Sequence, residues 1–259
     1  MLDQLPIPAI IAHRGASAYA PENTLAAFEL AVRQKADAIE LDVKLTKDNH
    51  VVVFHDQTLE RTTGVQGRVI DAKLADLRGL DAGSHFDVAY WGETIPTLDE
   101  VFELVGRQIL TNVELTNYAS PTDHLPERVA EIVKSHNLAE RVMFSSFNPI
   151  ALLRIHRKLP EVPIGLLALD GSKGFWARSR LGELLRYQSL HIALEDVAAS
   201  LVDRIHRQSC RLLVYTVNQA EDMRRLLQIG VDGIFTDDPL TARRILSTSN
   251  EQRMRNRES

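Results

Sequence analysis

The sequence has a single cysteine, no long apolar run and no excess of positive charge, and each absence excludes a class of protein. Cys210 cannot form an intramolecular disulfide, which is typical of proteins from a reducing compartment. No segment approaches the roughly 18 consecutive apolar residues that a membrane span requires. The apolar run 8–12 is also too short for the core of a signal peptide. We therefore expect a cytoplasmic protein without integral membrane contact.

The charge balance argues against a nucleic-acid partner. The chain has 30 lysines and arginines against 35 aspartates and glutamates, a net charge of −5, whereas domains that bind nucleic acid are usually basic. Its 259 residues are enough for one α/β barrel or for two smaller domains.

Strand-like apolar runs alternate with helix-like segments along the whole chain. We expect strands at 9–13, 38–44, 51–55, 109–115, 141–146, 163–169, 190–194, 211–217 and 233–236. We expect helices at 23–34, 98–105, 125–136, 149–158, 174–186, 197–208, 221–228 and 239–246. Because the run 51–55 follows the second strand so closely, it is predicted to return as a hairpin, which leaves eight strand–helix units. Eight units in about 250 residues are typical of an α/β fold of the TIM (β/α)8 barrel type.

A doubly wound open sheet is the alternative fold, but no GxGxxG or GxxxxGK[ST] turn follows any expected strand. Residues 62–97 are too long for an ordinary connection, so we interpret them as an insertion on the rim of a single-domain barrel spanning 1–259. A short helix is expected within it at 73–78. Its aromatic residues Phe86, Tyr90 and Trp91 either shape a substrate pocket or pack as a flap. The insertion also offers a surface for a homodimer. The polar tail 248–259 is expected to be frayed.

Two acids lie one residue apart in the expected strand 38–44. Since side chains alternate along a strand, Glu40 and Asp42 point to the same face, and their apolar neighbours point the other way. Paired acids inside a barrel are costly unless a cation or a base compensates them. Carboxylate oxygens suit one divalent metal, Mg²⁺ or Ca²⁺. Glu114 shows the same pattern in a later strand and would complete the site, whereas an exposed edge strand is the alternative interpretation.

Two histidines, His13 and His55, each follow an expected strand, where barrel enzymes place catalytic groups. Imidazole is accessible in both protonation states near pH 7, so one ring can accept a proton from an attacking oxygen and the other can donate one to a leaving alcohol. Arg14 suits contact with a phosphoryl oxygen. Lys44 shares the face of the acid pair, where it either balances the carboxylates or reaches the substrate. The other seven histidines are interpreted as structural by default, although His85 in the insertion could touch substrate and His191 is placed to line the barrel mouth.

Ordered motifs from residue 13 to about 239 resemble the glycerophosphodiester phosphodiesterase family. The matching segments are HRG at 13–15, PENT at 21–24, ELDV at 40–43, VFHD at 53–56, NVEL at 112–115, SSF at 145–147, TVN at 216–218 and GVDGIFTD at 230–237.

This resemblance implies a TIM barrel that hydrolyses glycerophosphodiesters, such as glycerophosphocholine or glycerophosphoethanolamine, to sn-glycerol 3-phosphate and an alcohol. It implies a metal held by Glu40, Asp42 and Glu114, with His13 and His55 as the acid/base pair. It also implies that Arg14 contacts the phosphate, that Asn23 orients the site, and that Phe147 and Tyr215 contact the substrate.

The chain departs from the family pattern at two positions. Many members have lysine where this chain has Thr116 and tryptophan where it has Tyr215. Both departures concern substrate choice, and Lys44 is expected to replace part of the missing positive charge.

Three alternatives stay open at this point. A phosphodiesterase of the lysophospholipase D type would share the barrel but need an apolar access path. A sugar-phosphate isomerase or aldolase barrel would have no use for two histidines together with three acids. A non-catalytic barrel that binds a phosphate ligand would not need both imidazoles. Chelation with EDTA distinguishes the non-catalytic barrel from a metal-dependent phosphodiesterase, because the enzyme loses turnover whereas the binder has none.

Overall fold

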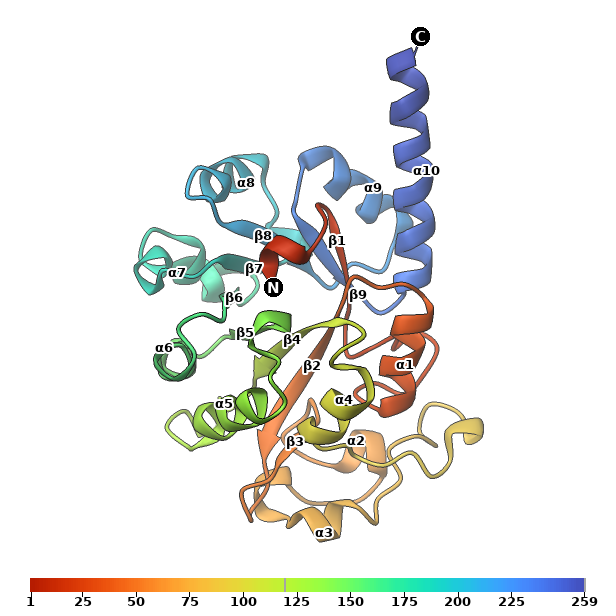
Figure 1. The fold of residues 1–259 in the computed structure, drawn as a ribbon, viewed down its shortest axis with the longest axis vertical. Helices are drawn as coiled ribbons and strands as arrows, with labels where there is room; N and C mark the ends of the chain where they lie inside the picture. Colours follow the sequence, from red (N-terminus) through yellow and green to blue (C-terminus); the bar gives the residue numbers. More distant parts are fainter. Residues whose placement is uncertain (119, 259) are drawn as a thin grey trace.

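Eight parallel strands close into a barrel in the computed structural model, which describes residues 1–118 and 120–258, with side chains as far as residue 248 (Figure 1). The strands are β1 (Ala9–Ala12), β2 (Ala38–Leu45), β4 (Leu110–Leu115), β5 (Val142–Ser146), β6 (Ile164–Ala168), β7 (Ser189–Ala193), β8 (Arg211–Tyr215) and β9 (Gly233–Thr236). Closure comes from β1, which pairs in parallel with both β9 and β2. The predicted TIM barrel is therefore confirmed, and an open sheet is excluded because β1 has no free edge.

Helices cover the outside of the barrel, and most begin where the sequence predicts. They are α1 (Leu25–Arg33), α4 (Leu98–Val105), α5 (Leu125–Ser135), α6 (Pro149–Lys158), α8 (Ala199–His206), α9 (Ala220–Ile229) and α10 (Pro239–Glu258). Thr24 caps α1 by accepting a hydrogen bond from the Ala27 backbone, and Thr97 forms a capping box with Glu100 at the start of α4. None of the helices in the described residues has both the length and the apolar character to cross a bilayer.

Apolar side chains form two separate layers around the strands. One layer fills the space between strands and helices and includes Ile39, Leu41 and Val113. A second cluster lies inside the barrel and includes Leu110 and Met143. Because alternate residues of a strand face opposite sides, the inner cluster plugs one end of the barrel and leaves the inward positions nearer the carboxyl ends for other side chains.

The hairpin strand β3 (Val51–Val53) adds to the far end of β2. The end of β1, at Ile11 and Ala12, pairs only with the beginning of β2. The later part of that edge of β2 is therefore free for antiparallel pairing with β3. β3 therefore runs back toward the barrel, as the short connection predicts. The Phe54 backbone N–H donates to the carbonyl of Asp42 at 2.8 Å, which brings the residues after β3 to the inner positions of β2.

The insertion packs on a small core of its own. It contains α2 (Glu60–Thr63), α3 (Leu74–Leu77) and 3-10 turns at Val69–Asp71 and Val88–Tyr90. Its apolar cluster consists of Val52, Phe54, Leu59, Val69, Leu77, Ala82 and Ile95. In Figure 1 this segment lies at one end of the molecule, while α10 extends past the opposite end. The expected short helix at 73–78 is confirmed as α3.

The prediction of a single helix at 174–186 is wrong. The segment instead forms a 3-10 turn at Gly171–Gly174, the single-turn helix α7 (Phe175–Arg178) and a 3-10 turn at Gly182–Leu185. Close backbone contacts explain the difference, since a Cβ on Gly174 would lie 1.7 Å from the Leu169 carbonyl oxygen. The Arg178 guanidinium also donates to that oxygen and to Asp196, which holds the segment as a compact turn.

The last helix is longer than predicted. α10 continues to Glu258, where the sequence predicts an end at 246 and a frayed tail from 248. No glycine or proline interrupts residues 247–258, and most of them are good helix formers such as glutamate, glutamine, arginine and methionine. The polarity of this segment therefore did not predict its backbone conformation.

Candidate active site

A cavity of about 260 Å³ opens at the carboxyl ends of the barrel strands. Eight of the ten predicted site residues line it: His13, Arg14, Glu40, Asp42, His55, Glu114, Phe147 and Tyr215. Five further residues complete the lining, Asn112, Leu167, His191, Thr216 and Phe235. The predicted site is therefore assembled in one place from segments more than 200 residues apart.

Three carboxylates crowd together on one wall of this cavity. Glu40, Asp42 and Glu114 each offer an oxygen within 4.8 Å of the others, because β2 and β4 pair in register with Asp42 beside Glu114. Burial and the neighbouring carboxylates raise the pKa of Glu40 well above its ordinary value. Burial and the charge of Asp42 raise the pKa of Glu114 to about 8, although the Tyr118 hydroxyl donates a hydrogen bond to it. Such mutual repulsion, in a set made only of hard oxygen atoms, fits a divalent cation.

His13 pairs with Asp237, a residue 224 positions away in the sequence. The His13 Nδ1 lies 2.7 Å from Asp237 Oδ1, and the His13 backbone N–H donates to the Thr236 carbonyl, which continues the pairing of β1 with β9. Burial raises the pKa of the Asp237 carboxyl, but hydrogen bonds from His13, Asn218 and Ser17 outweigh it and hold this pKa below its usual range. Asp237 therefore stays ionised, orients the ring and leaves Nε2 for the cavity.

His55 has an equivalent partner in Asp56. Nδ1 of the ring lies 2.7 Å from Asp56 Oδ1, and Arg61 donates to the other carboxylate oxygen at 2.6 Å. Burial opposes ionisation, but Arg61 and His55 lower the pKa of Asp56 below its ordinary value. One correction concerns the origin of this residue. His55 does not end a barrel strand, since it follows the antiparallel strand β3 and reaches the site because β3 runs back along β2.

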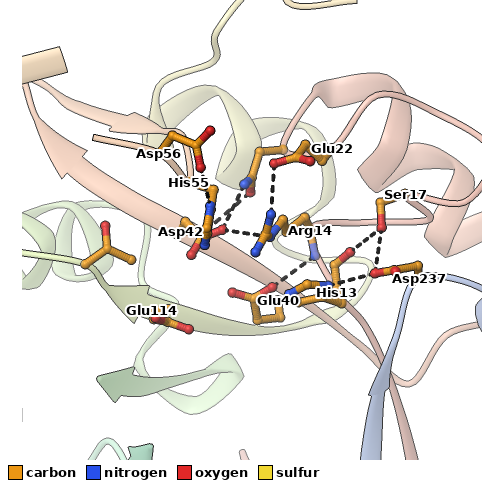
Figure 2. A network of polar contacts seen from close by, with 12 residues as sticks. His13, Arg14, Ser17, Glu22, Glu40, Asp42, His55, Asp56, Glu114 and Asp237 are labelled. Atoms are coloured by element: carbon orange, nitrogen blue, oxygen red, sulfur yellow. Dashed lines mark hydrogen bonds and ion pairs between the residues drawn. The ribbon is translucent and has the colours of Figure 1, made fainter. Parts of the chain in front are cut away.

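Arg14 occupies the centre of the polar network in Figure 2. Its Nη1 donates to Glu22 at 3.0 Å, its Nε lies 3.4 Å from Asp42, and its backbone N–H donates to Glu40 Oε2 at 2.9 Å. Burial raises the pKa of Glu22, yet Arg61 and Arg14 together lower it to about 2. The guanidinium is thereby fixed beside the carboxylates, where an anionic group would meet it.

A left-handed turn places Arg14 in this position. Arg14 and Gly15 have φ values of 56° and 86°, and a Cβ on Gly15 would lie 2.7 Å from Ala27 in α1. Only glycine satisfies both the dihedral angle and the close approach. The chain therefore reverses directly after His13 and directs the Arg14 N–H at Glu40.

Two predicted site residues, Asn23 and Lys44, lie outside the cavity lining. Asn23 is buried behind Asp42 and donates to Asp42 Oδ2 at 2.9 Å, so it supports the expected orienting role. The Lys44 ammonium donates to Thr116 Oγ1 at 2.6 Å. Burial lowers the pKa of Lys44, while Asp42 and Glu114 act in the opposite direction. Lys44 thus lies nearer the carboxyl end of β2 than Asp42, where its charge can balance the carboxylates, and its contact with substrate stays a prediction.

Sequence reasoning missed several residues that the structure places at the site. Asp237 and Glu22 each lay within a matched motif, at 230–237 and 21–24, without an assigned role. His191, which was expected at the barrel mouth, does line this cavity, but it had been given no role. Alternation along β4 could have found Asn112, because it shares a face with Glu114.

The aromatic end of the insertion takes no part in the cavity. Phe86, Tyr90 and Trp91 are absent from the lining residues. The Tyr90 hydroxyl instead donates to the carbonyl of Tyr19 at 2.7 Å, and its ring meets Phe86 edge to face. A packed flap therefore agrees with the contacts of Tyr90 and Phe86 but not with Trp91, which is 78% exposed.

A comparison with protein families matches residues 13–241 to the glycerophosphoryl diester phosphodiesterase family. A glycerophosphodiester phosphodiesterase of Caldanaerobacter subterraneus subsp. tengcongensis is 42% identical over 233 residues, which cover 90% of this chain and 95% of that protein. One from Bacillus subtilis is 34% identical over 244 residues, covering 88% and 83%.

A solved structure shows the same architecture. It is an Oleispira antarctica phosphodiesterase in complex with the product sn-glycerol-3-phosphate. The two chains superimpose with a TM-score of 0.85 at 34% identity, and the match covers 93% of this chain and 97% of that one.

Proposed function

This chain belongs to the glycerophosphoryl diester phosphodiesterase family, a family of hydrolases, and we propose that it hydrolyses glycerophosphodiesters such as glycerophosphocholine and glycerophosphoethanolamine. The products are sn-glycerol 3-phosphate and the alcohol. One observation carries the proposal: three crowded carboxylates lie in a single cavity with an arginine and two histidines that are each bound to an aspartate. Phosphodiester hydrolysis needs charge neutralisation and two proton transfers, and this set can supply both.

Glu40, Asp42 and Glu114 are the residues that would hold one divalent cation, Mg²⁺ or Ca²⁺. Their repulsion in a buried site and the absence of nitrogen or sulfur donors among them support a hard cation. When bound, such a cation neutralises charge on phosphate oxygens and lowers the barrier to attack. Asn23 supports this set by fixing the Asp42 carboxylate through its side-chain amide.

The two histidines carry the proton transfers. Asp237 and Asp56 accept hydrogen bonds from the Nδ1–H groups of His13 and His55, which leaves each Nε2 for the cavity. One ring takes a proton from the attacking oxygen, which is either water or the glycerol 2-hydroxyl. The other ring gives a proton to the oxygen of the departing alcohol. Arg14 holds a phosphoryl oxygen throughout, because Glu22 and Asp42 fix its guanidinium.

Phe147 and Tyr215 form an aromatic wall of the cavity. Their ring centroids lie 6.1 Å apart in an edge-to-face arrangement, and the Tyr215 hydroxyl donates to the Ala168 carbonyl at 2.5 Å. Because this hydroxyl already has a partner, Tyr215 presents its ring to the substrate. We propose that these two residues contact the organic part of the diester, and that Lys44 adds positive charge near the phosphate.

Release of sn-glycerol 3-phosphate from glycerophosphocholine and glycerophosphoethanolamine tests the proposal. Protein stripped with EDTA is assayed alone and with Mg²⁺, Ca²⁺ or Mn²⁺, beside His13→Ala and the exposed control His85→Ala. We expect metal-restored release that His13→Ala lowers about 10²- to 10⁴-fold and that His85→Ala leaves unchanged. If no metal restores release from either diester, the glycerophosphodiester assignment is wrong. Activity on lysophospholipids alone would then favour the lysophospholipase D type, and no activity would favour a phosphate-binding barrel.

A cytoplasmic location, the lack of a nucleic-acid partner and a homodimer through the insertion stay predictions. The single cysteine and the net charge of −5 support the first two. Light scattering of the purified chain measures the third.

A further inference from the structure

The cavity continues beneath Asp42 and Glu114 toward the inner apolar cluster. Asn112 precedes Glu114 by two residues on β4, so its side chain shares the inner face and lies about 6.6 Å deeper along the strand. β2 and β4 pair in register at this level, with Glu40 beside Asn112. His191 on β7 lines the same cavity from another strand. The space available to a ligand therefore extends well below the level of Asp42 and Glu114.

Asn112 has a polar atom without a partner. The side chain is 1% exposed, and its Nδ2 donates to Ser145 Oγ at 2.9 Å. Its Oδ1 has no hydrogen-bond partner among the residues that the structure describes. The bond to Ser145 fixes the amide, so Oδ1 is held as a buried acceptor.

His191 repeats this arrangement. The residue is fully buried, its Nε2 lies 2.9 Å from Ser189 Oγ, and its Nδ1 has no partner within residues 1–118 and 120–248. The ring packs against Phe235 at a centroid distance of 5.0 Å. Burial lowers the pKa of His191 to about 3, so the ring is neutral and suited to an uncharged polar group rather than to the phosphate.

Burying one unpaired polar atom costs about 1 to 3 kcal/mol, and two such atoms on residues that line one ligand-sized cavity indicate a site that a ligand completes after a small side-chain adjustment. Leu167 and Phe235 also line the cavity and provide no strong polar group. We propose that Asn112 and His191, here called the polar floor, form a subsite for hydroxyl groups and recognise the glycerol half of the diester. This inference rests on the proposed function and adds the basis of its selectivity.

The depth of the site explains how the substrate would lie. With the phosphate at the level of Arg14 and Glu114, the three-carbon chain of glycerol reaches down to the polar floor, where a hydroxyl donates to Asn112 Oδ1 and another pairs with His191 Nδ1. The alcohol on the other side of the phosphate then points toward the open mouth. The enzyme should thus discriminate strongly at the glycerol and weakly between choline and ethanolamine.

A pair of substrates tests this selectivity without any mutation. We would compare kcat/KM for choline release from glycerophosphocholine and from n-propyl phosphocholine, which lacks both hydroxyls. Loss of a substrate hydroxyl from a site built to bind it leaves protein groups unpaired, so we expect the propyl ester to be at least about 10-fold poorer. Because the missing 2-hydroxyl is also a candidate nucleophile, binding of sn-glycerol 3-phosphate and of n-propyl phosphate is compared as well, which measures recognition without turnover. Equal values for the two esters would overturn the inference even if no variant folds.

Two variants then identify the residues. His191→Phe removes both ring nitrogens and keeps the aromatic packing, and His191→Asn retains a polar atom near the position of Nδ1. We expect His191→Phe to reduce the preference for the glycerol ester about 10-fold or more and His191→Asn to restore much of it. His156→Phe is the matched control, because His156 Nδ1 also lacks a partner in the described residues but lies on α6 outside the cavity. An unchanged ratio in His191→Phe, or an equal change in His156→Phe, would contradict the assignment.

Failure of this inference is distinguishable from failure of the proposed function. If the unmodified protein cleaves neither ester, the function is wrong, and calorimetry with sn-glycerol 3-phosphate and n-propyl phosphate still measures the subsite. Tighter binding of the glycerol compound, lost in His191→Phe, supports the polar floor. Equal binding of both compounds refutes it.

Discussion

Replacing Glu114 by glutamine is expected to stabilise the metal-free protein at neutral pH while removing a ligand that the proposed function needs. Glu114 shares the buried carboxylate group with Glu40 and Asp42, and burial together with Asp42 raises its pKa to about 8 from an ordinary value of 4.5. Glutamine keeps a carbonyl oxygen that can accept the hydrogen bond of the Tyr118 hydroxyl. The substitution therefore removes a charge with little change in shape.

The sign of the pH dependence follows from the raised pKa of Glu114. Between pH 4.5 and 8 this carboxyl is protonated in the folded chain and ionised in the unfolded chain, so unfolding releases a proton and stability falls as pH rises. One such group contributes at most about 1.4 kcal/mol per pH unit. From pH 5.5 to 7.5 the unmodified protein should lose up to ~2.7 kcal/mol that Glu114→Gln keeps.

Urea denaturation in EDTA at pH 5.5 and 7.5 measures this difference. Comparing the two proteins cancels the histidines that titrate over the same range, and Glu161→Gln at an exposed position is the control. Saturating Mg²⁺ or Ca²⁺ should flatten the pH dependence of the unmodified protein, since a ligand that binds only the folded state stabilises it, and should do little for Glu114→Gln. Equal pH dependence in both proteins would refute the argument, because Glu114 would then be ionised at pH 5.5 despite its neighbours.

Two further predictions concern the turn after β1 and the support of His13. Gly15→Ala should destabilise the fold by about 2 to 5 kcal/mol, because it combines a positive φ with a Cβ 2.7 Å from Ala27; urea denaturation should show a clearly smaller loss for Gly64→Ala, which has a positive φ but no atom within 4 Å of the Cβ. Asp237→Asn should lower kcat for glycerophosphocholine about 10- to 100-fold, since it removes the ionised partner of His13 Nδ1; unchanged kcat across pH 5 to 9 would exclude this positioning role.

Local sequence patterns were sufficient to predict the barrel and most of the residues that line its cavity. Apolar runs, helix caps and the spacing of eight units predict the strands, and strict alternation places Glu40 and Asp42 on one face. Residues adjacent to these strands follow from the same reasoning, as His13 and Arg14 show. The segment around α7 was wrongly predicted as one helix. A close backbone approach at Gly174 prevents a continuous helix there, and the local sequence does not reveal such an approach.

Contacts between distant segments could not be read in this way. His13 and Asp237 meet only because β1 pairs with β9 and closes the barrel. The Glu22–Arg61 ion pair similarly depends on how the insertion returns to the loop after β1. A sequence without aligned relatives shows that each of these residues is polar, but not which partner it has. The supporting groups of the site were therefore harder to predict than the groups that face the cavity.

The division of the apolar core explains why the site can hold so many costly polar groups. Outward-facing strand residues such as Ile39, Leu41 and Val113 pack against the helices and build the larger cluster. The inward residues Leu110 and Met143 fill only the closed end of the barrel. Stability thus depends mainly on one face of each strand, and the other face is free for function. A substitution on the outer face of β2 should therefore act through folding, whereas one at the neighbouring inner position should act on metal or substrate and spare the fold.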